Sequence, residues 1–225
     1  MTMTLKAAKE AAGNVSLGNG KMPGSTYAIS ATKCGVGSKL VNVKGSTCAK
    51  CYALKLEKLR PSVHKGWLGN YEKATRLIET NPAQWVAACT FQIKRAFLKT
   101  GEPFHRWFDS GDLQSVEMLA AICEVARQTP TFRHWLPTRE AAIVKAYKAQ
   151  GGIIPSNLVV RVSSTMIGDN PIAGHATTST VHRKGSQPVG HACPASTQGN
   201  SCGFGSNACR ACWSDTVSNI SYPLH

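Results

Sequence analysis

The sequence predicts an α/β protein: a truncated (partial) (β/α) barrel with parallel strands and a C-terminal Cys-rich metal-binding segment. Apolar stretches that read as strands begin 28 and 26 residues apart, at "FHRWF" (104–108), "FRHWL" (132–136) and "LVVRV" (158–162). A helical pattern follows each of the first two. This spacing is that of a strand–helix unit, and strands alternating with helices form parallel sheets with right-handed crossovers. Four cysteines crowd the region 193–212.

The remaining elements follow in chain order. Residues 1–25 are glycine-rich and are expected to form a loop, and "STYAIS" (25–30) alternates as a short strand. Residues 34–51 are expected to form a loop that holds three cysteines. "TSTVHR" (178–183) is a further candidate strand, which brings the expected number to about five. That is too few for a closed eight-fold barrel.

Helices are predicted between these strands from the 3.6-residue spacing of apolar side chains. Asn81 and Pro82 mark the start of one helix, and Gly101 marks its end. The predicted helical stretches are "NYEKATRLIET" (70–80), residues 81–101, "SVEMLAAICEVARQT" (115–129) and "REAAIVKAYKAQGG" (139–152). We expect one globule with a partial barrel and its N-terminal Cys loop in 1–185 and the Cys-rich segment in 186–225.

Composition limits the class of protein. Hydrophobic residues make up 42% of the chain and charged residues 17%, as in an ordinary globular protein. No apolar run is long enough for a membrane span, and the N-terminus lacks the apolar core of a signal peptide. We therefore expect a cytoplasmic protein. In that reducing compartment, nine cysteines indicate metal ligands or reactive thiols more than disulfides.

The positive charge is unevenly distributed. The chain has a net charge of +14, and residues 33–76 contain ten Lys and Arg against two acids, Glu57 and Glu72. Such an excess attracts polyanions, of which nucleic acid is the commonest. The alternative is a solubilising surface, because charge by itself names no substrate.

Polar clusters follow three successive predicted strands. "DSGDLQS" follows the first, with Ser110, Gly111 and Asp112; "PTRE" follows the second, with Arg139; "SSTM" follows the third, beginning at Ser163. Parallel α/β folds place function at these carboxyl ends. Ser110 and Asp112 suit an amine or a hydroxyl, Gly111 permits close approach of backbone to a ligand, and Arg139 suits a carboxylate or phosphate. The alternative for several of these residues is helix capping.

The C-terminal cysteines form C-x8-C-x6-C-x2-C. They are Cys193, Cys202, Cys209 and Cys212, and the segment between them is rich in Gly and Ser, with little core of its own. A metal explains how such a segment folds. Four thiolates complete a zinc site or carry an iron–sulfur cluster, and the spacing leaves both open. Disulfides are the remaining alternative.

The N-terminal set is C-x13-C-x2-C, formed by Cys34, Cys48 and Cys51. A structural zinc needs a fourth ligand, for which His64 is the histidine nearby in sequence. Three thiolates on a four-iron cluster instead leave one iron open for a ligand. Cys89 and Cys123 lie on apolar helix faces and are expected in the core.

Three cysteines after the first strand of a partial barrel, ending in "CAKCY", resemble the radical S-adenosylmethionine superfamily. "LGNGKM", "TCAKCYA", "RWFDSGDLQS", "LPTREA", "RVSS" and "CPAS…C…CRACW" resemble, more narrowly, small phage-encoded radical-SAM-like proteins. The motifs span nearly the whole chain, from Leu17 to Trp213. The first spacer has thirteen residues, where the superfamily usually has three.

The resemblance implies an enzyme in which Cys34, Cys48 and Cys51 hold a [4Fe–4S] cluster. The cluster would bind and reductively cleave S-adenosylmethionine to a 5′-deoxyadenosyl radical that abstracts hydrogen from the substrate, with electrons from a donor. Candidate residues for binding S-adenosylmethionine are Tyr52, Ser110, Gly111, Asp112, Arg139 and Ser163. The four C-terminal cysteines would hold a second [4Fe–4S] cluster or zinc. A phage origin would place the protein in the host cytoplasm.

The alternative function is a non-catalytic, zinc-bearing nucleic-acid-binding protein. It uses the same cysteines and the same basic charge, but it leaves the polar strand ends unexplained.

Overall fold

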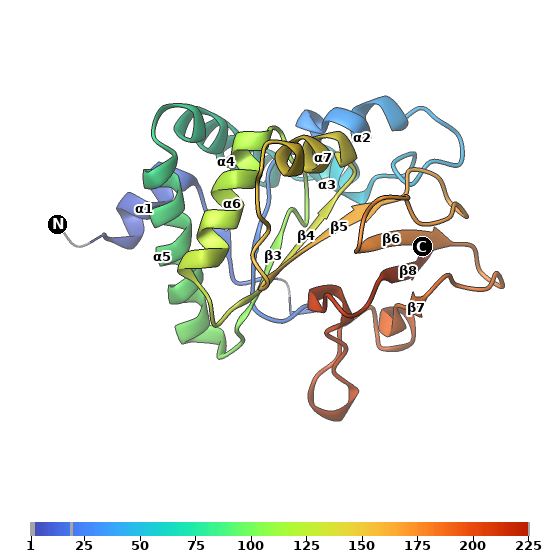
Figure 1. Ribbon diagram of the computed structural model, residues 1–225. Helices are drawn as coiled ribbons and strands as arrows, with labels where there is room; N and C mark the ends of the chain where they lie inside the picture. The colour runs from blue at the N-terminus through green and yellow to red at the C-terminus, as the bar shows by residue number, and fades with distance from the viewer. Residues whose placement is uncertain (1–2, 19, 225) are drawn as a thin grey trace.

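The computed structural model describes residues 3–18 and 20–224, where the strands form one open, eight-stranded sheet (Figure 1). In order across the sheet they are β1 (Val15–Ser16), β2 (Ser25–Tyr27), β3 (Phe104–Trp107), β4 (Arg133–Thr138), β5 (Leu158–Ser163), β6 (Thr178–His182), β8 (Asn219–Pro223) and β7 (His191–Ala192). β1 is antiparallel to β2, and all other neighbouring pairs are parallel. The predicted α/β class with parallel strands is confirmed.

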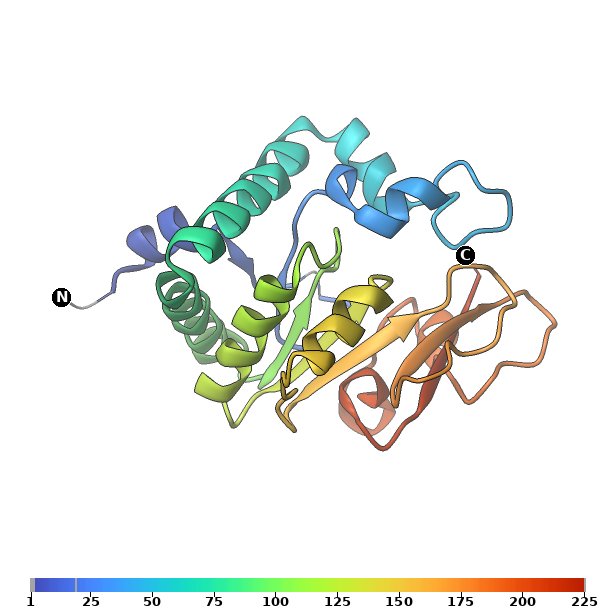
Figure 2. The same cartoon turned by 45° about the horizontal axis from the view of Figure 1, so that its top comes forward.

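The helices connect the strands and pack on the sheet (Figures 1 and 2). They are α1 (Leu5–Ala12), α2 (Gly35–Leu40), α3 (Tyr52–Leu59), α4 (Pro61–Thr80), α5 (Pro82–Thr100), α6 (Val116–Gln128) and α7 (Ala141–Ala149). The predicted end signals act as expected: the Asn81 side chain accepts from Gln84 N, and Gly101 ends α5 in the left-handed region at φ 68°. Because β2 to β6 follow one another in chain order, each crossover runs in the same direction across the sheet.

The sheet is buried on both faces. Trp107, Leu136 and Val160 belong to the main core with the helices, whereas Trp135 packs with Trp213 of the C-terminal segment. Residues that alternate along a strand point to opposite faces, so a single strand such as β4 contributes to both cores. The C-terminal segment thus covers the second face, as a parallel sheet requires.

Three sequence-based expectations were wrong or incomplete. Residues 1–25 are not only loop, because they form α1 and β1, and the cysteine loop contains the short helix α2. The sheet has eight strands in the described residues rather than about five. The extra strands β1, β7 and β8 are short or lie in the Cys-rich segment, where alternation is weak. Asn19 of the "LGNGKM" motif lies outside the described residues.

None of the helices in the described residues combines the length and apolar character of a membrane span.

Two neutral histidines lie in the main core. His105 and His134 are fully buried, with ring centroids 5.5 Å apart. The Thr129 hydroxyl donates to Val125 O, so His134 Nε2–H donates to that hydroxyl, over 2.8 Å. Burial lowers the pKa of His134 from 6.5 to about 3, and burial together with His134 lowers the pKa of His105.

We predict that acid destabilises the protein through these histidines. A depressed folded-state pKa means that the stability is present above pH 6.5 and is lost as the pH falls from 6.5 towards 3. Each such histidine adds about 1.4 kcal/mol per pH unit to the slope of the unfolding free energy. His134→Gln should reduce that slope between pH 6 and 4 in urea titrations. An unchanged slope in His134→Gln would contradict this reading.

Candidate functional site

The cysteine loop lies across the carboxyl ends of the central strands. At the end of β5, Thr47 N donates to Thr165 O over 2.8 Å. At the end of β3, the Tyr52 hydroxyl donates to Asp109 O. The loop is therefore fixed to the edge of the sheet where the polar clusters lie, and Figure 1 shows α2 and α3 there.

The structure brings Cys34 and Cys48 together around Gly37. A β-carbon on Gly37 would lie 3.6 Å from Cys34 Sγ and 3.7 Å from Cys48 Sγ, so any side chain there would enter the space beside both sulfurs. Cys51 follows in a tight turn in which its N–H donates to Cys48 O over 3.1 Å. Cys34 and Cys48 are thus brought together although thirteen residues separate them in the sequence.

The three thiols are electrostatically coupled. The pKa of Cys34 is raised to about 12, mainly by burial and also by negative charge on Asp112, Cys51 and Cys48, while Arg139 opposes the shift. Burial also raises the pKa of Cys48, again against Arg139. These two thiols are neutral by themselves, so any metal bound there would have to displace their protons.

Asp112 fixes the end of β3 to the end of β4. Its Oδ1 accepts from the Thr138 hydroxyl over 2.6 Å, and its Oδ2 accepts from Arg139 N over 2.9 Å. Burial raises the pKa of Asp112 to about 6, although these hydrogen bonds lower it. Arg139 Nε then donates to Thr47 Oγ1 over 3.0 Å. Asp112 and Arg139 therefore position the cysteine loop.

Two further buried carboxylates hold the Cys34 segment. Glu140 Oε1 accepts from Val36 N over 2.6 Å, at the N-terminus of α2. Glu57 Oε1 accepts from Ala31 N over 2.7 Å, and Glu57 Oε2 pairs with His64 Nδ1 over 2.7 Å. His64, the candidate fourth zinc ligand, thus uses one ring nitrogen on Glu57.

Other predicted residues occupy the same edge with different roles. Ser110 Oγ and Asp109 Oδ1 are buried without a hydrogen-bond partner. Gly111 has φ 82°, and a β-carbon there would lie 2.8 Å from Ile29 O. The absence of a side chain at Gly111 therefore lets the backbone at Ile29 approach closely, rather than a ligand. Ser163 Oγ lies 2.8 Å from Ser179 Oγ.

The four C-terminal cysteines form a second cluster. Cys209 N donates to Cys202 O over 2.7 Å. Burial is the main cause that raises the pKa of Cys202, and negative charge on Cys193 and Cys209 raises it in smaller part. The pKa of Cys212 is raised to about 12, mainly by burial and in smaller part by Cys193 and Cys202. Cys212 Sγ lies 3.2 Å from the Tyr222 hydroxyl.

Arg161 on β5 holds this second cluster against the sheet. The side chain is fully buried, and all five of its N–H groups face backbone carbonyls. The acceptors are Cys212 (3.1 Å), Thr178 (3.3 Å), Val217 (2.8 Å), Ala211 (2.9 Å) and Ser214 (2.6 Å). Burial lowers its pKa, while Tyr222 and Cys212 oppose the shift. The sequence reasoning missed Arg161, although a charge inside the apolar strand "LVVRV" was a signal.

All nine cysteines are free thiols. Cys89 and Cys123 are fully buried in the main core, as predicted. Within residues 3–18 and 20–224, no three His, Cys, Asp or Glu side chains are arranged to hold a single metal ion.

We predict that Arg161→Lys destabilises the C-terminal segment. Lysine keeps the charge but has three donors on a flexible stem, so it leaves buried carbonyls unpaired. The expected loss is about 3–5 kcal/mol of unfolding free energy, with faster proteolysis within 193–214. Arg183→Lys, at an exposed position, is the matched control. Equal stability of the two variants would show that the carbonyl contacts contribute little.

Comparison with known proteins identifies one family. A family model described as gene product 88 matches residues 3–215. No curated protein and no solved structure matches the chain. Because the match covers most of the sequence, including both cysteine clusters, the chain belongs to the gene product 88 family.

Proposed function

We propose that the protein is a radical-SAM-type iron–sulfur enzyme acting on an anionic substrate. The observation that carries the proposal is that Cys34 and Cys48 lie together around Gly37 at the carboxyl edge of a parallel sheet, with Cys51 following Cys48 in a tight turn. Strands in chain order with helices as crossovers are also how a (β/α) barrel is built, so we interpret the open sheet as a partial barrel.

The residues fit a thiolate-bound cluster on three grounds. The donor set is three cysteines, as iron–sulfur clusters use. Gly37 leaves space beside the sulfurs of Cys34 and Cys48. Ser110 Oγ and Asp109 Oδ1 are buried and unpartnered at the neighbouring strand end, where a ligand would supply their partners.

Each residue has a role under this proposal. A bound [4Fe–4S] cluster would supply the electron that cleaves S-adenosylmethionine to a hydrogen-abstracting radical. Ser110 and Asp109 would bind polar groups of that ligand, because they have hydrogen-bonding capacity to spare. Asp112 and Arg139 would position the loop, since their groups already bind Thr138 and Thr47.

The C-terminal cysteines would hold a second [4Fe–4S] cluster or a zinc ion. Arg161 supports a negatively charged centre, because it is a buried cation that forms no ion pair with a carboxylate in the described residues. Cys212, whose carbonyl Arg161 binds, would contribute one thiolate. Thiolate charge offsets the cost of burying a guanidinium.

The surface charge supports an anionic substrate, most simply a nucleic acid. Lys50, Lys55, Lys58 and Arg60 are exposed at and after the cysteine loop. Glu57, one of the two acids of this region, is buried and paired, so it does not offset their charge at the surface. Phosphates would displace counterions from such a surface.

We predict that Cys48→Ala abolishes one cluster. After anaerobic reconstitution, wild-type protein should absorb near 400 nm and cleave S-adenosylmethionine once reduced. Cys48→Ala should lose that cleavage and part of the iron per chain, with its far-UV circular dichroism unchanged. Cys123→Ala removes a buried core cysteine and should keep full iron. Zinc without iron in the wild type, or undiminished cleavage in Cys48→Ala, would overturn the proposal.

We predict that Gly37→Ala impairs cluster assembly. The new methyl group would lie 3.0 Å from Cys34 Cβ and beside both sulfurs, so iron per chain should fall by at least half. Gly66→Ala is the matched control, since Gly66 is also helical but a β-carbon there has no neighbour within 4 Å. That control should stabilise the helix by up to about 1 kcal/mol and leave the iron content unchanged.

A further inference from the structure

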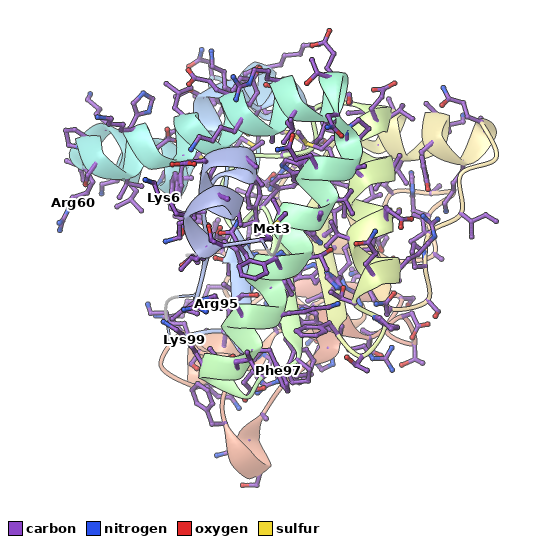
Figure 3. The ribbon with its side chains drawn as sticks, turned by 90° about the vertical axis from the view of Figure 1, so that its left-hand side faces the viewer. Met3, Lys6, Arg60, Arg95, Phe97 and Lys99 are labelled. Carbon is purple, nitrogen blue, oxygen red and sulfur yellow. The ribbon has the colours of Figure 1, made fainter. Side chains whose placement is uncertain are left out.

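We infer that a pocket between α1, β1 and α5 binds a nucleotide through its phosphate. The pocket has a volume of about 270 Å³, and none of its lining residues belongs to either cysteine cluster. Three of those residues are cations, Lys9, Arg95 and Lys99. Figure 3 shows Arg95 and Lys99 projecting from α5 on the side where Lys6 of α1 lies.

The walls of this pocket are fixed by buried polar side chains. Gln92 of α5 is 3% exposed, and its amide donates to Gly13 O over 3.0 Å and accepts from Val15 N over 3.1 Å. Asn70 of α4 accepts from Asn14 N over 2.8 Å. α1 and β1 are thus held on α5 before any ligand arrives, which lowers the entropic cost of binding.

The charges in the pocket lack a counterion. Lys9, Arg95 and Lys99 form no ion pair in the described residues, and no acidic side chain lines the pocket. Arg95 and Lys99 stand four positions apart on α5, where like charges repel. The helix dipoles account for Lys9 and Lys99, which stand in the last turns of α1 and α5, but not for Arg95 beside them. A bound anion would remove the repulsion.

The rest of the lining favours a ligand larger than a phosphate ion. Leu5, Val15 and Leu17 form an apolar wall beside the three cations. Leu17 is 47% exposed, so it has apolar surface to cover. A nucleotide has a charged phosphate and a flat base, which match the two parts of this lining. At about 270 Å³ the pocket lies just below the roughly 300–1,000 Å³ of ordinary ligand sites, and like them it combines apolar and polar lining.

The nucleotide can be free or part of a strand, because both present the same phosphate and base. Arg60 lies on the same side of the molecule as Lys6, Arg95 and Lys99 (Figure 3). A strand bound at the pocket could therefore extend along this side towards α3. The binding experiment distinguishes the two sources.

The test is isothermal titration of the full-length protein with AMP, inorganic phosphate and a ten-nucleotide single strand. The double variant Arg95→Gln/Lys99→Gln keeps helix propensity and should weaken nucleotide binding at least tenfold, as expected for lost charged hydrogen bonds. Lys145→Gln/Lys148→Gln on α7 removes the same charge from exposed positions and should change binding by less than about twofold. Leu17→Ala should weaken AMP binding about threefold without affecting phosphate.

If the wild type binds AMP and the Arg95→Gln/Lys99→Gln variant does not, the result supports a free nucleotide as the ligand. Binding of the strand alone, lost in the same variant, supports a nucleotide within a chain. The inference is overturned if the wild type binds neither, if the α7 control loses as much affinity, or if phosphate binds as tightly as AMP. None of these variants touches a cysteine, so this inference and the iron–sulfur proposal fail independently.

Discussion

The buried guanidinium of Arg161 is the interaction on which the second half of the fold depends. It lies in the middle of β5 and binds carbonyls of the segment that carries the C-terminal cysteines. Without it, that segment would bury unpaired carbonyls against the sheet. With it, Trp213 packs on Trp135, with ring centroids 5.1 Å apart, and covers the second face of the sheet. A single charged side chain thus converts a Gly- and Ser-rich segment into part of the core.

Buried carboxylates play the corresponding part at the other cluster. Glu57 and Glu140 each accept a backbone N–H from the segment around Cys34, and Asp112 fixes the strand ends beneath it. The chain has only twelve Asp and Glu residues, and these three are buried and hold the cysteine loop in place. These buried acids do not offset the Lys and Arg side chains at the exposed surface, which is correspondingly basic.

The main strands and helices could be predicted because their signals are local. Alternation and 3.6-residue spacing depend on neighbours in sequence, and the caps Asn81 and Ser115 bind backbone groups three residues away. The sequence did not predict α1 and β1, because a short helix with an alanine stripe and a two-residue strand carry little periodic pattern. They exist because Gln92, from a distant helix, binds their backbone.

The sequence by itself determined the α/β class, the polar strand ends and the two sets of cysteines, because each is written in residue types and short spacings. Only the tertiary structure decided which residues meet. It brought Cys34 and Cys48, separated by thirteen residues in sequence, to the same side chain-free position at Gly37. It also placed Asp112 in a hydrogen bond with Thr138 and left Ser110 Oγ without a partner. Contacts between residues far apart in sequence depend on how strands are ordered and how loops cross their ends, and no local pattern records that geometry.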